Sequence, residues 1–171
     1  MELLRKYKTK IEDEVEKISN DINDLLDKHL IPKATTPESE VFYMKMKGDY
    51  GRYYAECVTG EKNQNAGKKA NEAYKKATEK AASLPATNSL RLGLALNYSV
   101  FFYEIMNSPK EACKMAKTAF DGAIGDLESL DDDQYKESAS IMQLLRDNLT
   151  LWTADEAEED APKGGEDVKD L

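Results

Sequence analysis

The chain has 171 residues, of which 40% are hydrophobic and 33% charged, and its formal net charge is −9. This length fits a single domain, and the composition is that of a globular protein that can bury a core. The richest apolar stretch, residues 90–106, is interrupted by Arg91, Asn97 and Glu104, so no run approaches the ~18–20 residues that a membrane helix needs. The charged start, MELLRKYKTK, contains no signal-peptide hydrophobic region, which predicts a protein that stays inside the cell.

Residue types that carry catalytic or metal chemistry are sparse. Cys57 and Cys113 lie far apart and form no Cys-x-x-Cys pair, so we expect reduced, mostly buried thiols. The single histidine, His29, is interpreted as a helix-end residue. The sequence contains no phosphate-binding glycine loop, no dinucleotide fingerprint and no His-Glu-x-x-His motif. These observations predict a protein that is not an enzyme and that has no metal site and no cofactor.

Charge is unevenly distributed along the chain. Residues 154–171 contain eight acids and two lysines, a net charge of −6, which leaves −3 for residues 1–153. The same segment is poor in apolar groups and contains Pro162, Gly164 and Gly165, so it is predicted to be a disordered acidic tail after one domain over residues 1–153. The nearly neutral domain has no basic stripe, which argues against nucleic acid or a membrane as a partner.

Helical periodicity runs through most of the domain, which predicts an all-α fold. Apolar residues recur every three or four positions from Leu4 to Leu26, and this helix is expected to end before Pro32. Thr36 is the predicted N-cap of a second helix over residues 37–58, with Pro37 in its first turn. The residues that this second helix is expected to bury are Phe42, Met46, Tyr50, Tyr54 and Cys57.

Four more helices are predicted, over residues 65–84, 89–106 and 109–127 and from residues 131–133 onward. The helix at 89–106 is apolar almost all round and is expected to lie centrally. The sequence Ser108-Pro109-Lys110-Glu111 predicts a capping box with proline at the first helical position.

A weak internal repeat relates the alanine-rich helices. Ala70, Ala73, Tyr74 and Ala77 match residues 116, 119, 120 and 123 in type and spacing. The repeat predicts successive antiparallel hairpins that resemble a tetratricopeptide-type stack, in a bundle of about six helices. The alternative is a coincidence between alanine-rich helices.

Three helices carry polar residues on faces that the core pattern does not explain. Arginine offers a planar fork that matches phosphate, and the asparagine amide suits the main chain of an extended peptide. Arg52 could equally belong to a solvated ion-pair ladder, Asn97 could be a satisfied core amide, and Trp152 could belong to the core. The three faces comprise Lys45, Asp49, Arg52, Tyr53 and Glu56; Gly93, Asn97, Val100 and Glu104; and Ile141, Leu144, Asn148 and Leu151.

Three strings of residues carry a family resemblance: VFYMKMKGDYGRYYAE at 41–56, RLGLALNYSVFFYEIMNSP at 91–109 and MQLLRDNLTLWT at 142–153. In this order they resemble the 14-3-3 proteins, and the similarity runs from about residue 3 to Thr153. The resemblance implies an all-helical, non-catalytic adaptor in signal transduction. Such a protein binds extended phosphoserine or phosphothreonine peptides of client proteins in an amphipathic groove, in the cytoplasm or also in the nucleus.

The resemblance also assigns roles to individual residues. It implies that Arg52 and Tyr53 bind phosphate and that Tyr7, Lys10 and Glu14 belong to a dimer interface. One local departure from the family is Gly51, where the family usually has an aromatic residue. The implied peptide groove is lined by Lys45, Leu96, Asn97, Val100, Glu104, Ile141, Leu144, Asn148, Leu151 and Trp152.

The family resemblance begins almost at Met1, whereas a family member normally has three further helices before this point. Those helices supply one side of the dimer interface and two more cations of the phosphate pocket. We therefore expect phosphopeptide binding to be impaired. The alternative is a non-binding structural or dominant-negative fragment that associates with full-length relatives.

Overall fold

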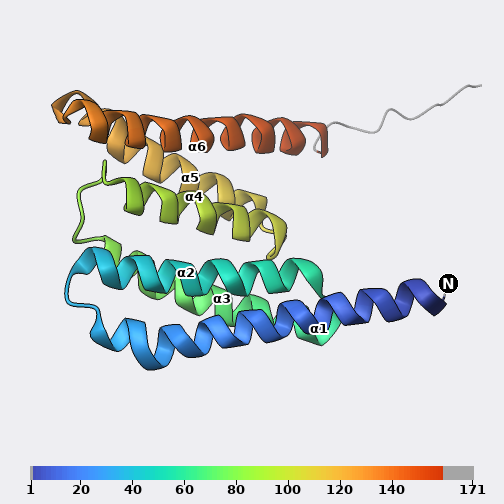
Figure 1. Ribbon diagram of the computed structural model, residues 1–171. Helices are drawn as coiled ribbons and strands as arrows, with labels where there is room; N and C mark the ends of the chain where they lie inside the picture. The colour runs from blue at the N-terminus through green and yellow to red at the C-terminus, as the bar shows by residue number, and fades with distance from the viewer. Residues whose placement is uncertain (1, 160–171) are drawn as a thin grey trace, which may run out of the picture.

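The computed structural model describes residues 2–159, and within that range every regular element is a helix (Figure 1). A π-helical turn at Leu26–Leu30 and a 3-10 turn at Ile31–Lys33 follow the first helix, and another 3-10 turn, Leu127–Ser129, precedes the last. The all-α prediction is confirmed. The six long helices are α1 (Glu2–Leu25), α2 (Pro37–Cys57), α3 (Gly60–Ala81), α4 (Ser89–Glu104), α5 (Pro109–Ile124) and α6 (Asp132–Glu159).

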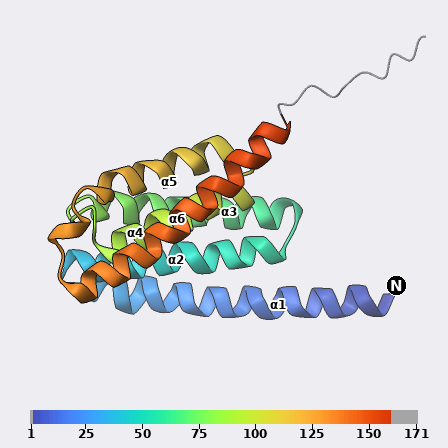
Figure 2. The same cartoon turned by 90° about the horizontal axis from the view of Figure 1, so that it is seen from above.

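The helices form two layers built from hairpins. In Figure 1, α2 and α4 lie in front of α3 and α5, and α1 packs alongside α2 at one end of the stack. Figure 2, seen from above, shows the same layers, with α6 crossing obliquely over α4. Helix α4 contacts α2, α3, α5 and α6. Its predicted central position is therefore confirmed, and it explains why this helix is apolar almost all round.

Two hydrophobic clusters lie on the two sides of α4. The first joins α3 to α4 through Tyr74, Tyr98 and Phe101, and the Tyr74 and Tyr98 rings stack with their centroids 5.0 Å apart. The second joins α4 and α5 to α6 and includes Leu92 and Leu145. Because α4 contributes to both clusters, it fixes the distance between the α2–α3 hairpin and α6.

Helices α2 and α3 approach each other closely because small residues face large ones. A Cβ atom added to Gly48 would lie 2.6 Å from Cδ1 of Tyr74, which is closer than real contacts allow. A Cβ atom added to Gly51 would lie 3.0 Å from the Cβ atom of Ala70. Gly51, a departure from the family pattern, therefore lies at a point where the α2–α3 spacing leaves little room for a side chain.

The buried face predicted for α2 is wrong. The residues that α2 buries are Val41, Gly48, Asp49 and Ala55. Of the five residues predicted to be buried, Phe42 and Cys57 are exposed and Met46, Tyr50 and Tyr54 are half-buried. Val41, Gly48 and Ala55 are spaced by seven positions on the buried face, and Gly48 on this face makes the close contact with Tyr74 of α3. The prediction followed the large apolar side chains of α2. A close contact between two helices requires small residues on the buried face, so the large side chains did not mark that face. Cys57 is also exposed, contrary to the expectation of mostly buried thiols, and Cys113 is half-buried.

The predicted helix starts are confirmed where the signal is specific. Thr36 caps α2 in a reciprocal pair of hydrogen bonds with Ser39, and α5 begins at Pro109. The predicted capping box of α5 is wrong, because the Ser108 hydroxyl donates to the Met106 carbonyl instead. Helix α3 begins at Gly60, five residues before its predicted start.

The last helix runs past the boundary predicted for the acidic tail. That boundary lies at Ala154, whereas α6 continues to Glu159. The rest of the predicted tail, residues 160–171, lies outside the described residues. None of the helices within residues 2–159 is long and apolar enough to cross a membrane.

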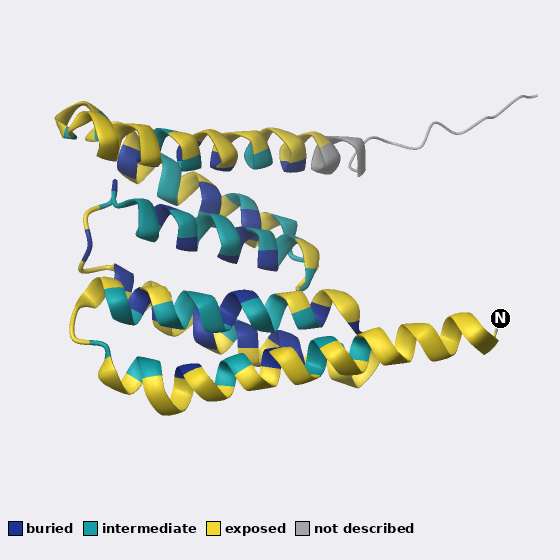
Figure 3. Cartoon of the chain, viewed as in Figure 1, coloured by how far each residue is buried: buried dark blue, intermediate teal, exposed yellow. Residues whose placement is uncertain are grey.

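Helix α1 is only partly covered by the rest of the chain. Its N-terminal part projects beyond α2, and residues 2–11 are all exposed (Figure 3). Leu26, in the turn after α1, is fully buried, but the apolar stripe that precedes it faces solvent at most of its positions. The exposed large apolar residues of this stripe, the α1 row, are Leu4, Tyr7, Ile11, Ile18 and Leu25.

Candidate functional site

The polar face predicted on α2 is organised around a buried carboxylate, Asp49. Its Oδ1 atom accepts hydrogen bonds from the Tyr74 hydroxyl at 2.7 Å and from Nδ2 of Asn97 at 2.9 Å. Its Oδ2 atom accepts from Nζ of Lys45 at 2.8 Å. One carboxylate therefore ties α2 to α3 and α4 and holds two side chains of the candidate groove, Lys45 and Asn97.

These hydrogen bonds stabilise the fold, because burying a carboxylate without donors raises the free energy of the folded state. Burial also raises the pKa of Tyr74, and the charge of Asp49 raises it further, so the phenol remains a donor. The sequence pattern placed Asp49 only in an ion-pair ladder and Tyr74 only in the repeat. The signal that could have found them is the position of Asp49 next to Gly48, on the face of α2 that packs against α3.

Arg52 lies one turn after Asp49, and its side chain is only 12% exposed. Its Nη1 atom donates to the Glu56 carboxylate, and its guanidinium carbon lies 4.6 Å from the centre of the Tyr53 ring. Burial lowers the pKa of Arg52, but hydrogen bonding with Tyr74 and the charge of Glu56 outweigh burial, so that the pKa is raised. The buried Nε atom has no hydrogen-bond partner among the described residues. Arg52 is therefore a fixed positive charge with one donor unused.

The side chains of this face form ion pairs, but the pairs are not solvated as the ladder interpretation assumes. Lys45 pairs with Asp49 and Arg52 pairs with Glu56, each with the four-residue spacing of a helical ion-pair ladder. A true surface pair, Lys117–Asp121, has the same spacing and the same 2.8 Å distance, but its side chains are 69% and 56% exposed. The side chains of Lys45 and Asp49 are only 20% and 12% exposed. Lys45 and Arg52 are therefore enclosed rather than solvated.

The polar and apolar faces meet across α4 at Gly93. A Cβ atom there would lie 3.9 Å from Cε of Lys45, on α2, and 4.0 Å from Cδ1 of Ile141, on α6. Leu96 and Val100 of α4 and Ile141 of α6 are half-buried against the second cluster. The structure therefore brings together a polar wall on α2 and an apolar wall on α4 and α6.

The sequence profile of the 14-3-3 protein family matches residues 1–153. The chain belongs to the 14-3-3 family. It is 59% identical to the protein BMH2 of Saccharomyces cerevisiae over 159 residues, which are 92% of this chain and 58% of that protein.

Proteins of Hordeum vulgare and Schizosaccharomyces pombe are about as similar. The 14-3-3-like protein A of Hordeum vulgare is 55% identical over 168 residues, 98% of this chain and 63% of the relative. The checkpoint signal transducer rad24 of Schizosaccharomyces pombe is 56% identical over 166 residues, 96% of this chain and 62% of the relative. The chain thus spans about three fifths of the length of these relatives.

Several residues that the 14-3-3 resemblance assigns to the groove lie outside the Asp49 cluster. Glu104, Leu144 and Leu151 are exposed, and Asn148 is half-buried on α6. Trp152 is only 4% exposed and stacks on Tyr103, with 4.8 Å between ring centroids. The indole therefore contributes to the core of this structure, and a contact between Trp152 and a ligand stays a prediction.

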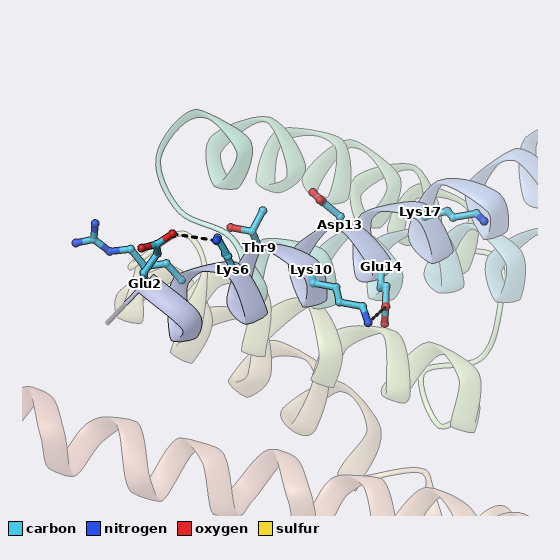
Figure 4. Close-up of a pocket in the computed structure, with 8 residues that line it drawn as sticks. Glu2, Lys6, Thr9, Lys10, Asp13, Glu14 and Lys17 are labelled. Carbon is cyan, nitrogen blue, oxygen red and sulfur yellow. Dashed lines mark ion pairs between the residues drawn. The ribbon is translucent and has the colours of Figure 1, made fainter.

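The residues assigned to a 14-3-3 dimer interface lie on the exposed part of α1. Lys10 and Glu14 form an ion pair at 3.9 Å, drawn in Figure 4 beside an open hollow lined by charged residues. Tyr7 is exposed. No described residue outside α1 lines this hollow, and an interface here stays a prediction.

The described residues also bear on metal chemistry. Within residues 2–159, no group of three or more His, Cys, Asp or Glu side chains is placed to hold a metal ion.

Proposed function

We propose that this 14-3-3 chain is an adaptor that binds extended peptides carrying phosphoserine or phosphothreonine. The observation that carries the proposal is the enclosed guanidinium of Arg52, which lies over the ring of Tyr53 on the same face of α2 as Lys45. A phosphate group carries about −1.5 to −2 charges and several acceptor oxygens, and an arginine fork offers it two parallel donors. The hydroxyl of Tyr53, which is exposed, would supply a further donor.

Asn97 supports binding of the peptide main chain. Its Nδ2 atom donates to Asp49, which fixes the orientation of the amide and leaves the carbonyl oxygen available to accept a peptide N–H. Ile141 and Val100, on the other wall, would contact apolar side chains of the same peptide. An extended ligand would thus meet cations and an amide on one side and hydrocarbon on the other.

The proposed binding is weak, because both cations already have partners. Lys45 pairs with Asp49 and Arg52 with Glu56, so a phosphate must replace the Glu56 carboxylate at Arg52. We expect dissociation constants above about 1 μM for the isolated chain. The free energy gained by binding the phosphate is offset in part by the loss of the ion pair between Arg52 and Glu56.

The test is a titration of the chain with a phosphoserine peptide library and the matching unphosphorylated peptides, followed by fluorescence anisotropy. Phosphate-dependent binding in the micromolar range or weaker supports the proposal. Equal affinity for the phosphorylated and unphosphorylated peptides contradicts it. Sub-micromolar binding contradicts the expectation that the site is impaired.

A second candidate function is association with full-length relatives without peptide binding. The exposed α1 row favours it, because contiguous exposed apolar surface of this kind often marks an interaction site. Native mass spectrometry of the chain mixed with a full-length 14-3-3 protein measures this directly. A mixed species that forms while peptide titrations remain flat would favour this second function over the first.

A further inference from the structure

A cavity of about 410 Å³ lies between α3, α4 and α5. Helices α3 and α5 form the rear layer in Figure 1. None of the residues predicted for the peptide groove or the dimer interface lines it. Arg91, Ala95 and Phe102 of α4 line the cavity, whereas Gly93 and Asn97 belong to the candidate groove. Residues two positions apart on a helix project about 200° apart, so the cavity and the groove lie on opposite faces of α4.

The cavity exists because small residues meet where three elements converge. Side chains of one carbon or none come from the end of α3 and the turn after it, from α4 and from α5. Such residues leave space that the neighbouring backbones cannot close. Six of the lining residues are of this kind: Ala81, Ala82, Ala86, Ala95, Ala119 and Gly122.

The rest of the wall is largely hydrocarbon, supplied by residues such as Leu94, Phe102 and Met115. The hydroxyl groups of Thr78 and Thr118 donate to backbone carbonyls within their own helices, each at 2.8 Å. Their hydroxyl hydrogens are therefore not available as donors to a ligand in the cavity. An apolar cavity of this size suits the hydrocarbon part of a ligand.

Three charged side chains line the same cavity: Arg91, Glu111 and Lys114. Glu111 and Lys114 lie three positions apart on α5 and offset each other in charge. Arg91 is the remaining charge, and its Nη1 atom donates to the Leu84 carbonyl at 2.6 Å, which holds the guanidinium in place. Its other N–H groups can form the two-pronged contact that matches a carboxylate.

We propose that this cavity binds an amphiphilic monocarboxylate, with its apolar chain between α3, α4 and α5 and its carboxylate at Arg91. The single excess positive charge matches a singly charged head group. The apolar lining matches a hydrocarbon chain. The site is independent of the peptide groove, so both ligands can occupy the protein at once.

The test uses dodecanoate below its micelle-forming concentration, with dodecanol and dodecyltrimethylammonium as probes of equal chain length. Binding is measured by calorimetry and mapped by amide NMR shifts. We expect one dodecanoate per chain, with shifts at Ala81, Ala95 and Ala119, and weaker binding of the alcohol and the cation. Equal binding of all three probes, or shifts confined to α1, would overturn the proposal.

Two glycines of α5 supply a matched pair of variants. Gly122 lines the cavity and Gly125 ends the helix outside it, and a Cβ atom added at either position meets no atom within 4 Å. Gly122→Leu is expected to fold normally and to weaken dodecanoate binding about tenfold or more by occupying the cavity. Gly125→Leu is expected to bind like the parent protein. Unchanged binding in Gly122→Leu would overturn the site.

A second variant tests the head group. Arg91→Gln is expected to weaken dodecanoate about tenfold to a hundredfold while leaving dodecanol unchanged, because only the carboxylate uses the guanidinium. Arg91→Lys should restore part of the preference. An equal loss for dodecanoate and dodecanol in Arg91→Gln would overturn the role of Arg91 in recognising the carboxylate.

Discussion

Lys45–Asp49 and Lys117–Asp121 are the same ion pair in two environments. Each joins a lysine to an aspartate four residues later on one helix, with 2.8 Å between Nζ and Oδ2. The buried aspartate also accepts hydrogen bonds from Tyr74 and Asn97, whereas the side chain of Asp121 is 56% exposed. At the scale of residues, burial and shared partners therefore separate a structural carboxylate from a surface one.

Asp49→Asn is expected to lower the free energy of unfolding by about 1.5–3 kcal/mol, the range for charge-assisted hydrogen bonds in a buried site. The amide cannot match three donors, and Lys45 loses its partner. Asp121→Asn removes an exposed pair of the same geometry and should change the free energy by less than about 0.5 kcal/mol. Urea unfolding of both variants measures the difference, and similar effects of the two substitutions would contradict the structural role of Asp49.

Arg52 is expected to dominate any phosphate recognition. Arg52→Lys should lose phosphate dependence almost as fully as Arg52→Ala, because lysine keeps the charge but offers only a compact point donor. A simple surface ion pair would instead make Arg52→Lys nearly silent, and Arg52→Ala would cost only about 0.2–0.5 kcal/mol. The measurement compares phosphorylated and unphosphorylated peptides with both variants. Equal affinity of the parent protein and Arg52→Lys for the phosphorylated peptide would exclude the assigned role.

At the scale of elements, the α2–α3 contact sets the position of the polar cluster. The Tyr74 ring lies directly over Gly48, and its hydroxyl reaches Asp49 one residue further along α2. The contact that packs the two helices therefore also aims the phenol at the carboxylate. A change in the spacing of α2 and α3 would move Tyr74, Asp49 and the Asn97 amide together.

Gly48→Ala is expected to destabilise the protein by about 1–3 kcal/mol through overpacking, since the new Cβ atom meets the Tyr74 ring. Gly122→Ala makes the same chemical change where nothing lies within 4 Å, and it should stabilise the protein by about 0.4–1 kcal/mol. Thermal and urea unfolding measure both values. A stabilising effect of Gly48→Ala would show that α2 and α3 are not held this closely.

The elements were predictable where local chemistry decides them. Thr36 followed by Pro37, and Pro109 after Ser108, predict helix starts that the structure confirms. The buried face of α2 was not predictable from periodicity, because its close contact with α3 selects small residues.

The Asp49 cluster was missed for a related reason. Asp49 meets Tyr74 and Asn97 across 25 and 48 residues of sequence, so the position of Asp49 next to Gly48 could place it on the face that packs against α3 but could not name its partners. Arg52 and Tyr53, by contrast, stand in a contiguous string that the family resemblance identifies. The predicted site residues Arg52 and Tyr53 therefore come from a local string, whereas the hydrogen-bond partners of Asp49 come from tertiary packing.

At the scale of the whole molecule, the helices differ in how much of their surface other helices cover. Helix α4 has neighbours on four sides, whereas α1 contacts α2 over part of its length and projects beyond it (Figure 3). Leu4 is 73% exposed although it belongs to the same apolar stripe as Leu26, which is fully buried. The stripe is therefore a helical face with a partner at one end and solvent at the other.

The isolated chain is expected to self-associate or bind hydrophobic dye through the α1 row, and to unfold at a lower temperature than a full-length relative. Burying exposed apolar surface lowers the free energy by about 25 cal/mol per Å², so any contact that covers the α1 row is stabilised. The double variant Leu4→Lys, Ile18→Lys should reduce both the dye signal and the mass measured by light scattering.

The matched control places lysines at Leu144 and Leu151, two exposed leucines of α6. This variant should leave self-association unchanged, because its leucines lie on a different helix from the α1 row. If the α6 variant dissolves the assembly and the α1 variant does not, the apolar wall of the groove rather than α1 holds the copies together. A monomeric parent protein with a cooperative, high-temperature melt would show that the α1 row is tolerated in water without a partner.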